Sequence, residues 1–151
     1  TAISIETEPE PGFMTDWQAV FSLVLTQSVG VSSIIERVFP SRFQHIKLLN
    51  EMGAKTKFFQ PEVSDPTTYY HFNPESDKPE YFHGVKIYGP AKLHATNQAI
   101  TDLRAGATTA LAALTAEGQS TIDGVEYIER GYEKLAERLS SLGAKIKYIK
   151  T

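Results

Sequence analysis

The segment T-D-L-R-A-G-A-T-T-A-L-A-A-L-T-A-E-G, residues 101–118, carries an acid and a base at its start and no further charge until Glu117. A helix on the surface of a protein carries charges along its outer face, so this charge-free pattern is typical of a helix that is covered on nearly all sides. Thr101 or Asp102 suits the N-cap, where a side-chain oxygen accepts hydrogen bonds from free backbone N–H groups. The segment therefore predicts a buried helix whose start carries two charged residues, Asp102 and Arg104.

The same pattern occurs earlier in the chain, which indicates an internal duplication with an offset of about 90 residues. T-D-W-Q-A at 15–19 matches T-D-L-R-A at 101–105, and each leads into a long uncharged segment, so Thr15 or Asp16 takes the N-cap position in the first copy. Each copy then passes a glycine, enters a β-branched stretch (V-S-S-I-I-E-R-V or S-T-I-D-G-V-E-Y-I), and reaches an arginine. Both copies close on G-A-K-x-K.

Each copy reads as helix, strand, helix, strand. The second helix of each copy is amphipathic, with an apolar stripe made of Ile46, Leu49 and Met52 in the first copy and of Tyr132, Leu135, Leu139 and Leu142 in the second. Gly53 and Gly143 end these helices at the usual C′ position. One buried and one surface helix per unit predict an α/β domain whose buried helices are sandwiched by sheet. An ordinary two-layer α+β domain is the alternative.

Length and composition are those of a water-soluble protein of one domain, residues 1–151. The chain is 41% hydrophobic and 22% charged, with a net charge of -3 and no cysteine. The acidic balance argues against nucleic acid or an anionic membrane as a partner. The uncharged runs are too short to span a bilayer. Because the chain starts at Thr1 in a strand-like stretch, we expect it to be a piece of a longer protein.

Residues 59–84 form an insertion between the repeat units, which we place at approximately 1–58 and 85–151. The region from 59 to 100 is rich in turn signals, and short strands are expected at 68–73, 80–88 and 91–95. Five aromatic residues and two histidines of the insertion could stack on a ligand. A hairpin packed on its own aromatic side chains is the interpretation that we favour.

Charged residues recur at the ends of elements in both units, namely Asp16, Asp102, Arg42, Arg104 and Arg130. Arginine binds phosphate and carboxylate groups in a bidentate manner, and helix N-termini add backbone donors for anions. A carboxylate among them can act as a general base. Because equivalent ends in a repeat protein project from the same side, these groups predict a site for an anionic, phosphorylated small molecule.

Other kinds of site find little support in the sequence. The four histidines lack the spacing of a zinc site, so no metal is expected. Neither a glycine-rich nucleotide loop nor a G-x-S-x-G nucleophile motif is present.

The ordered motifs E-P-x-P-G-F-x-T-D-W-Q-A, E-R-V-F-P-S-R-F-Q-H, T-D-L-R-A and I-E-R-G-Y-E-K-L resemble those of the enolpyruvyl transferase family. The resemblance implies an inside-out α/β barrel with two repeated βαβαββ-like units, a partial lobe of a two-lobe enzyme whose other lobe is its partner. It also implies transfer of the enolpyruvyl group of phosphoenolpyruvate to the 3′-hydroxyl of UDP-N-acetylglucosamine, with release of phosphate. This is the first committed step of peptidoglycan synthesis, a cytoplasmic reaction without a cofactor.

The resemblance also implies roles for single residues. Asp16 would remove the proton of the sugar hydroxyl, and Arg130 would grip phosphoenolpyruvate as the lobes close. The remaining residues would bind substrate: Val38 and Phe39 at the nucleotide, Arg42 by its charge, and Asp102, Leu103 and Arg104 near phosphoenolpyruvate.

Three departures and two alternatives accompany this interpretation. About four extra residues precede Thr101, and the stretch 60–83 is longer than is usual in such enzymes. The third and most important departure that we expect is the lack, within these residues, of the first lobe, with its flexible loop that bears a cysteine or aspartate and its basic residues of the phosphate site. A sister transferase that acts on shikimate 3-phosphate is one alternative, and a non-catalytic binding module with the same fold is the other. Because the active site forms between two lobes, we expect no turnover by residues 1–151 alone.

Overall fold

The structure, a computed structural model, describes residues 1–149. Strands and helices alternate along the chain, so the α/β class is confirmed. The elements are, in order, β1 (Ser4–Glu6), α1 (Thr15–Thr26), β2 (Gly30–Ile35), α2 (Gln44–Glu51), β3 (Lys55–Phe59), α3 (Pro66–Tyr69), the 3₁₀ turn η1 (Pro74–Ser76), β4 (Gly84–Gly89), β5 (Asn97–Ala99), α4 (Leu103–Thr115), β6 (Thr121–Asp123), α5 (Val125–Glu129) and α6 (Leu135–Ser141).

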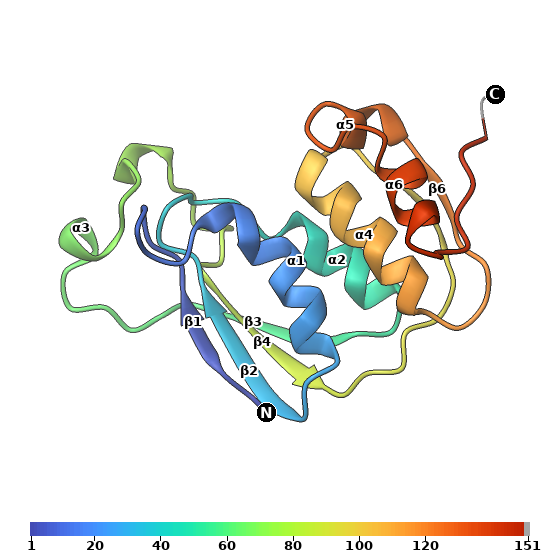
Figure 1. Cartoon of the computed structure of the whole chain (residues 1–151). Helices are drawn as coiled ribbons and strands as arrows, with labels where there is room; N and C mark the ends of the chain where they lie inside the picture. Colours follow the sequence, from blue (N-terminus) through green and yellow to red (C-terminus); the bar gives the residue numbers. More distant parts are fainter. Residues whose placement is uncertain (150–151) are drawn as a thin grey trace.

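A four-stranded sheet with the order β1-β2-β4-β3 forms one layer of the molecule (Figure 1). β1 runs parallel to β2, and β4 runs antiparallel to both β2 and β3. Helix α1 connects the parallel strands β1 and β2, and α2 connects β2 and β3, between which β4 is inserted. The second copy repeats this arrangement in part, because α4 connects the parallel pair β5 and β6.

The main core lies between the sheet and the helices. Helices α1 and α2 pack on the sheet, and α4 packs on both of them. The predicted stripe of α2 is confirmed, since Ile46, Leu49 and Met52 are fully buried. Gly53 follows α2 with a φ of 102° and ends it, as expected from the backbone freedom of glycine.

The prediction that both charge-free helices are covered on nearly all sides is wrong for α1. In α4, every residue from Ala105 to Ala110 is buried. In α1, by contrast, Trp17 and Val24 are 53% and 51% exposed. Sheet and α4 cover one face of α1, and the described residues leave the opposite face open to solvent. The absence of charges in α1 therefore indicated that the helix packs on other elements, but it did not indicate that only one face is packed.

The second unit departs from its sequence pattern after β6. Of the β-branched stretch S-T-I-D-G-V-E-Y-I, the first part is strand, but Gly124 turns the backbone with a φ of 83° and α5 begins at Val125. The second amphipathic helix is shorter than expected, and its predicted stripe is incomplete. Tyr132 and Leu135 pack on the smaller core, whereas Leu142 is 85% exposed.

The insertion between β3 and β4 projects to one side of the molecule (Figure 1). It contains α3 and η1 instead of the expected strand at 68–73, and 91–95 holds an isolated bridge from His94 to Glu117 instead of a strand. Its aromatic side chains pack on one another, as favoured above: the rings of Tyr70 and Phe72 stack with centroids 4.9 Å apart, and both contact His83.

Arg37, two residues after the end of β2, attaches the insertion to the sheet. Its Nε donates a hydrogen bond of 3.0 Å to the carbonyl oxygen of Tyr69, and its guanidinium lies 4.1 Å from the centroid of the Tyr69 ring.

Strand β4 belongs to the first sheet, where it hydrogen-bonds between β2 and β3. Our division at residue 85 had assigned this strand to the second unit.

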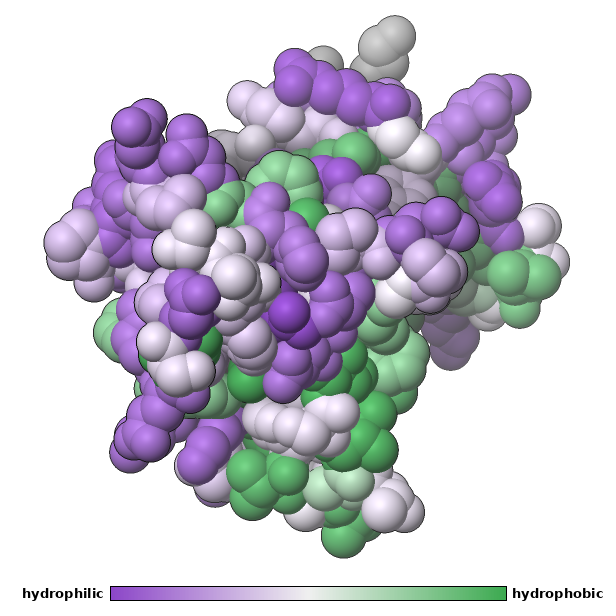
Figure 2. Space-filling model, turned by 90° about the vertical axis from the view of Figure 1, so that its left-hand side faces the viewer, coloured by the Kyte–Doolittle hydropathy of each residue, from purple (hydrophilic) through white to green (hydrophobic). Residues whose placement is uncertain are grey.

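Seen from the side of the insertion, the surface is mostly hydrophilic, with hydrophobic residues gathered toward the lower end of the view (Figure 2). Within residues 1–149, no helix combines the length and apolarity that a membrane crossing requires.

Candidate functional site

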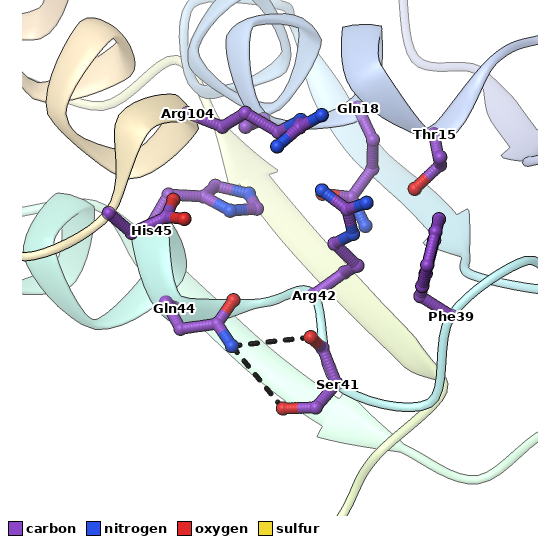
Figure 3. Close-up of a pocket in the computed structure, with 10 residues that line it drawn as sticks. Thr15, Gln18, Phe39, Ser41, Arg42, Gln44, His45 and Arg104 are labelled. Carbon is purple, nitrogen blue, oxygen red and sulfur yellow. Dashed lines mark hydrogen bonds between the residues drawn. The ribbon is translucent and has the colours of Figure 1, made fainter. Parts of the chain in front are cut away.

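A cleft of about 330 Å³ opens where the first turns of α1 and α4 meet the loop that leads into α2. This volume lies at the lower end of the usual range for small-molecule sites. Polar and charged side chains from three segments line it, and Arg42 and Arg104 point into the same space (Figure 3). The lining residues are Thr15, Gln18, Ala19, Phe39, Ser41, Arg42, Gln44, His45, Asp102 and Arg104.

Asp16 joins the two repeat units at the edge of this cleft. Its Oδ1 lies 2.5 Å from Nη2 of Arg104 and accepts a hydrogen bond of 2.7 Å from Nε of the same side chain. The same oxygen lies 3.8 Å from Nη1 of Arg42. The expectation that Thr15 or Asp16 caps α1 is wrong, because the helix already begins at Thr15 and its N-cap is Met14, which makes no side-chain capping bond.

Asp102 does cap its helix, as the sequence predicted. It has an extended backbone, and its Oδ1 accepts a hydrogen bond of 2.8 Å from the backbone N–H of Ala105. Such a bond satisfies one of the backbone donors that a helix start leaves free. Asp102 also lines the cleft, so one side chain holds the helix and adds negative charge to the site.

Arg42 is the more enclosed of the two arginines in the cleft. Its guanidinium lies 4.0 Å from the centroid of the Phe39 ring, a cation–π contact that fixes its direction. Burial lowers the pKa of Arg42, and the positive charge of Arg104 lowers it further. The negative charges of Asp16, Glu36 and Asp102 act in the opposite direction. A second cation placed this close to the first is suited to an anionic ligand.

The sequence reasoning missed Glu36, whose carboxylate lies beneath the loop at 38–39. Glu36 is 1% exposed and accepts hydrogen bonds from the backbone N–H groups of Val38 and Phe39, at 2.9 and 3.1 Å. An acid directly after an apolar, β-branched strand is the signal that could have identified it, since a charge at such a position is buried only with partners.

His45 was also missed as a part of the site. It is buried on the inner face of α2, and its Nε2 lies 2.9 Å from Oγ of Ser22 in α1. Burial lowers the pKa of His45 to about 3, so the ring is neutral at pH 7. The Ser22 hydroxyl donates to the carbonyl oxygen of Gln18, so it accepts from the Nε2–H group of His45. The sequence did contain a signal for the burial of His45, since this residue lies one helical turn before Leu49 on the apolar stripe of α2.

Four of the predicted site residues are not among those that line the cleft: Asp16, Val38, Leu103 and Arg130. Asp16 and Val38 are chain neighbours of the lining residues Thr15 and Phe39. Leu103 is the first residue of α4, and its side chain lies against the backbone of Gly131. Arg130 follows α5, and its guanidinium lies 4.8 Å from the centroid of the Tyr127 ring. Among residues 1–149, no group of three or more metal-binding side chains is gathered.

Comparison with known proteins places the chain in a family. The family model for EPSP synthase (3-phosphoshikimate 1-carboxyvinyltransferase) matches residues 1–139. UDP-N-acetylglucosamine 1-carboxyvinyltransferase 2 of Listeria monocytogenes is 40% identical over 144 residues, which are 95% of this chain and 29% of that protein. UDP-N-acetylglucosamine 1-carboxyvinyltransferase of Chlamydia trachomatis serovar D is 39% identical over 95% of this chain and 31% of its own length.

A solved structure shares the fold. The crystal structure of the enolpyruvyl transferase NikO from Streptomyces tendae superposes with a TM-score of 0.76 at 26% identity, over 99% of this chain and 30% of that one. The chain thus spans about 30% of the length of the curated relatives that it matches. On the match of residues 1–139 and on these relatives, the chain belongs to the EPSP synthase family.

Proposed function

We propose that the protein carrying this chain transfers the enolpyruvyl group of phosphoenolpyruvate to the 3′-hydroxyl of UDP-N-acetylglucosamine and releases phosphate. The observation that carries the proposal is the meeting of Asp16 with Arg42 and Arg104 at one cleft, across the two repeat units. The names of the relatives from Listeria and Chlamydia support this choice of acceptor.

The side chains divide the chemistry between them. Asp16 takes the proton of the sugar hydroxyl, whose oxygen forms a bond to the carbon that bears the phosphate, and that phosphate leaves. Arg104 must release the Asp16 carboxylate when the hydroxyl arrives, and it is then free to pair with phosphoenolpyruvate. Arg42 holds negative charge deeper in the cleft, with Asp102 beside it. No metal or cofactor is part of this proposal.

The remaining predicted residues take the roles that fit their positions. Val38 and Phe39 contact the nucleotide, and Leu103 supports the start of α4. Arg130 grips the phosphate or carboxylate of phosphoenolpyruvate when a second lobe closes over the site. The exposed face of α1 with Trp17 and Val24 would then be covered by the rest of an inside-out α/β barrel.

The domain division follows from the same proposal. Residues 1–151 form one domain, a partial lobe with an insertion at 59–84, and the pairing of β4 in the first sheet favours ending the first unit after residue 89. Peptidoglycan synthesis in the cytoplasm is the proposed setting.

Phosphate release from phosphoenolpyruvate by the full-length protein tests the proposal, with UDP-N-acetylglucosamine or shikimate 3-phosphate as acceptor. We expect release with the sugar nucleotide and its loss in Asp16→Ala. Asp123→Ala is the matched control, since this exposed acid lies on β6 away from the cleft lining and is expected to keep full activity. Release with shikimate 3-phosphate alone, or with neither acceptor, would contradict the proposal.

Acceptor choice matters because the family model that matches residues 1–139 carries the name of the shikimate-phosphate enzyme. Transfer to shikimate 3-phosphate is therefore the second candidate. Residues 1–151 by themselves are expected to release no phosphate with either acceptor, since the proposed site forms between two lobes.

A further inference from the structure

A buried carboxylate lies directly behind the cleft. Glu36 follows β2, is 1% exposed, and is not one of the cleft-lining residues. An ionised carboxylate is costly to bury unless it is hydrogen-bonded, so its set of partners shows what it does in the fold.

The two carboxylate oxygens bind different parts of the molecule. Oε1 accepts hydrogen bonds from the backbone N–H groups of Val38 and Phe39 and, at 2.9 Å, from the hydroxyl of Thr7 at the end of β1. Oε2 accepts from the hydroxyl of Thr15 at 2.8 Å and from the side-chain amide of Gln18 at 3.0 Å. One side chain therefore joins β1, the loop at 38–39 and the first turn of α1.

The donors select a carboxylate with two accepting oxygens. Backbone N–H groups can only donate, and the Thr7 hydroxyl already accepts a hydrogen bond of 2.8 Å from the N–H of Arg37. Gln18 presents its amide nitrogen, which also only donates. A glutamine at position 36 has one accepting oxygen and one donating nitrogen, so it cannot satisfy both sides without rearrangement.

The segments that Glu36 joins carry the reactive groups of the proposed site. Thr15 and Gln18 flank Asp16 in the first turn of α1, a helix start that has no side-chain cap of its own. The loop on the other side carries Phe39, on whose ring Arg42 packs. The distance between Asp16 and Arg42 therefore depends on the Glu36 carboxylate.

We propose that Glu36 is a positioning residue, which fixes the first turn of α1 relative to the loop at 38–39 and so sets the geometry in which Asp16 and Arg42 meet the substrates. Its effect on rate rests on the proposed function, whereas its effect on the loop does not.

A double-mutant cycle in the full-length protein tests the kinetic part. We expect Glu36→Gln to lower kcat for phosphate release about tenfold, and to lower it by clearly less when Asp16→Asn is already present, because the part of its effect that acts through Asp16 is then already lost. Thr7→Val is the matched control, since it removes a donor to the same carboxylate on the β1 side. Losses that multiply in the double variant, or an equal loss of kcat in Thr7→Val, would overturn the proposal.

Amide hydrogen exchange gives a readout that needs no activity. In Glu36→Ala we expect faster exchange in residues 36–42 and unchanged exchange in β4, and Glu36→Gln replaces this variant if it does not fold. Unchanged exchange in 36–42 overturns the proposal, and so does an equal increase in β4, which would indicate general loosening of the core. If the unaltered protein releases no phosphate, the proposed function fails, and exchange still decides whether Glu36 fixes the loop.

Discussion

The two copies of the T-D-x-x-A motif place their aspartates at the starts of α1 and α4, and the two side chains have different partners. Asp102 lies one residue before α4 and caps it through the N–H of Ala105. Asp16 lies inside α1, which begins two residues earlier relative to the motif, and it pairs with Arg104 instead. The start of α1 is bound by Glu36, through Thr15 and Gln18.

The difference shows how a repeat can acquire a reactive group. Once a buried carboxylate from a neighbouring strand binds the helix start, the aspartate of the motif no longer has to cap it. Its carboxylate is then available to groups outside the helix, here two arginines. The aspartate of the motif therefore stabilises the helix start in α4, whereas in α1 it serves the proposed chemistry.

The largest expected difference between the two aspartates concerns activity. Asp16→Asn is expected to lower kcat for phosphate release in the full-length protein by about 10²- to 10⁴-fold, the usual contribution of a general base. Asp102→Asn keeps an oxygen that can cap α4 and is expected to lose less. Steady-state phosphate release measures both, and a larger loss in Asp102→Asn would reverse the assignment of the two roles.

His45, a buried residue of α2 that lines the cleft, makes stability depend on pH. Its pKa is about 3 in the folded state because of burial, against 6.5 as its ordinary value. Below pH 6.5 the unfolded chain binds a proton that the folded state does not, so the contribution of His45 to stability falls by at most about 1.4 kcal/mol per pH unit down to about pH 3. Urea unfolding at several pH values measures the slope.

Two variants isolate this contribution. His45→Gln is expected to flatten the pH dependence, whereas His94→Gln, which alters an exposed histidine, is expected to leave it unchanged. An unchanged slope in His45→Gln would refute the assignment to this ring.

A glycine marks the next difference between the helices, since Gly106 of α4 occupies the position of Val20 in α1. A Cβ on Gly106 would lie 2.4 Å from Cδ1 of Ile100 and 2.9 Å from Cγ1 of Ile128. Gly106→Val is therefore expected to destabilise the protein by about 1–3 kcal/mol through overpacking. Thermal unfolding measures this, and a Gly106→Val variant as stable as the parent would show that α4 can move away from the smaller core.

The smallest expected effect concerns the caps themselves. Asp102→Ala removes a capping bond and is expected to cost about 1 kcal/mol of unfolding free energy. Asp16→Ala removes an ion pair of a largely exposed carboxylate, so it is expected to change stability by about 0.5 kcal/mol or less. Urea unfolding of both variants at pH 7 measures the difference, and the opposite order would break the comparison.

The sequence predicted the elements that depend on local patterns. The charge-free segments, the stripe of Ile46, Leu49 and Met52 and the stop at Gly53 were all readable, because helix periodicity and caps are local properties. The irregular parts of the chain were not. The helical turn at 66–69 and the early end of β6 depend on how the insertion and Gly124 pack, and single-sequence patterns do not contain that information.

The candidate site divides in the same way. The sequence by itself determined that Asp16, Arg42, Asp102 and Arg104 stand at element ends, and the motifs determined the family. Only the tertiary structure decided that Asp16 pairs with Arg104, that Glu36 binds the start of α1, and that His45 lies buried and neutral against Ser22 of α1. The physical reason is distance, since hydrogen bonds, ion pairs and desolvation act between atoms that meet only when residues 18 to 88 positions apart in the chain fold together.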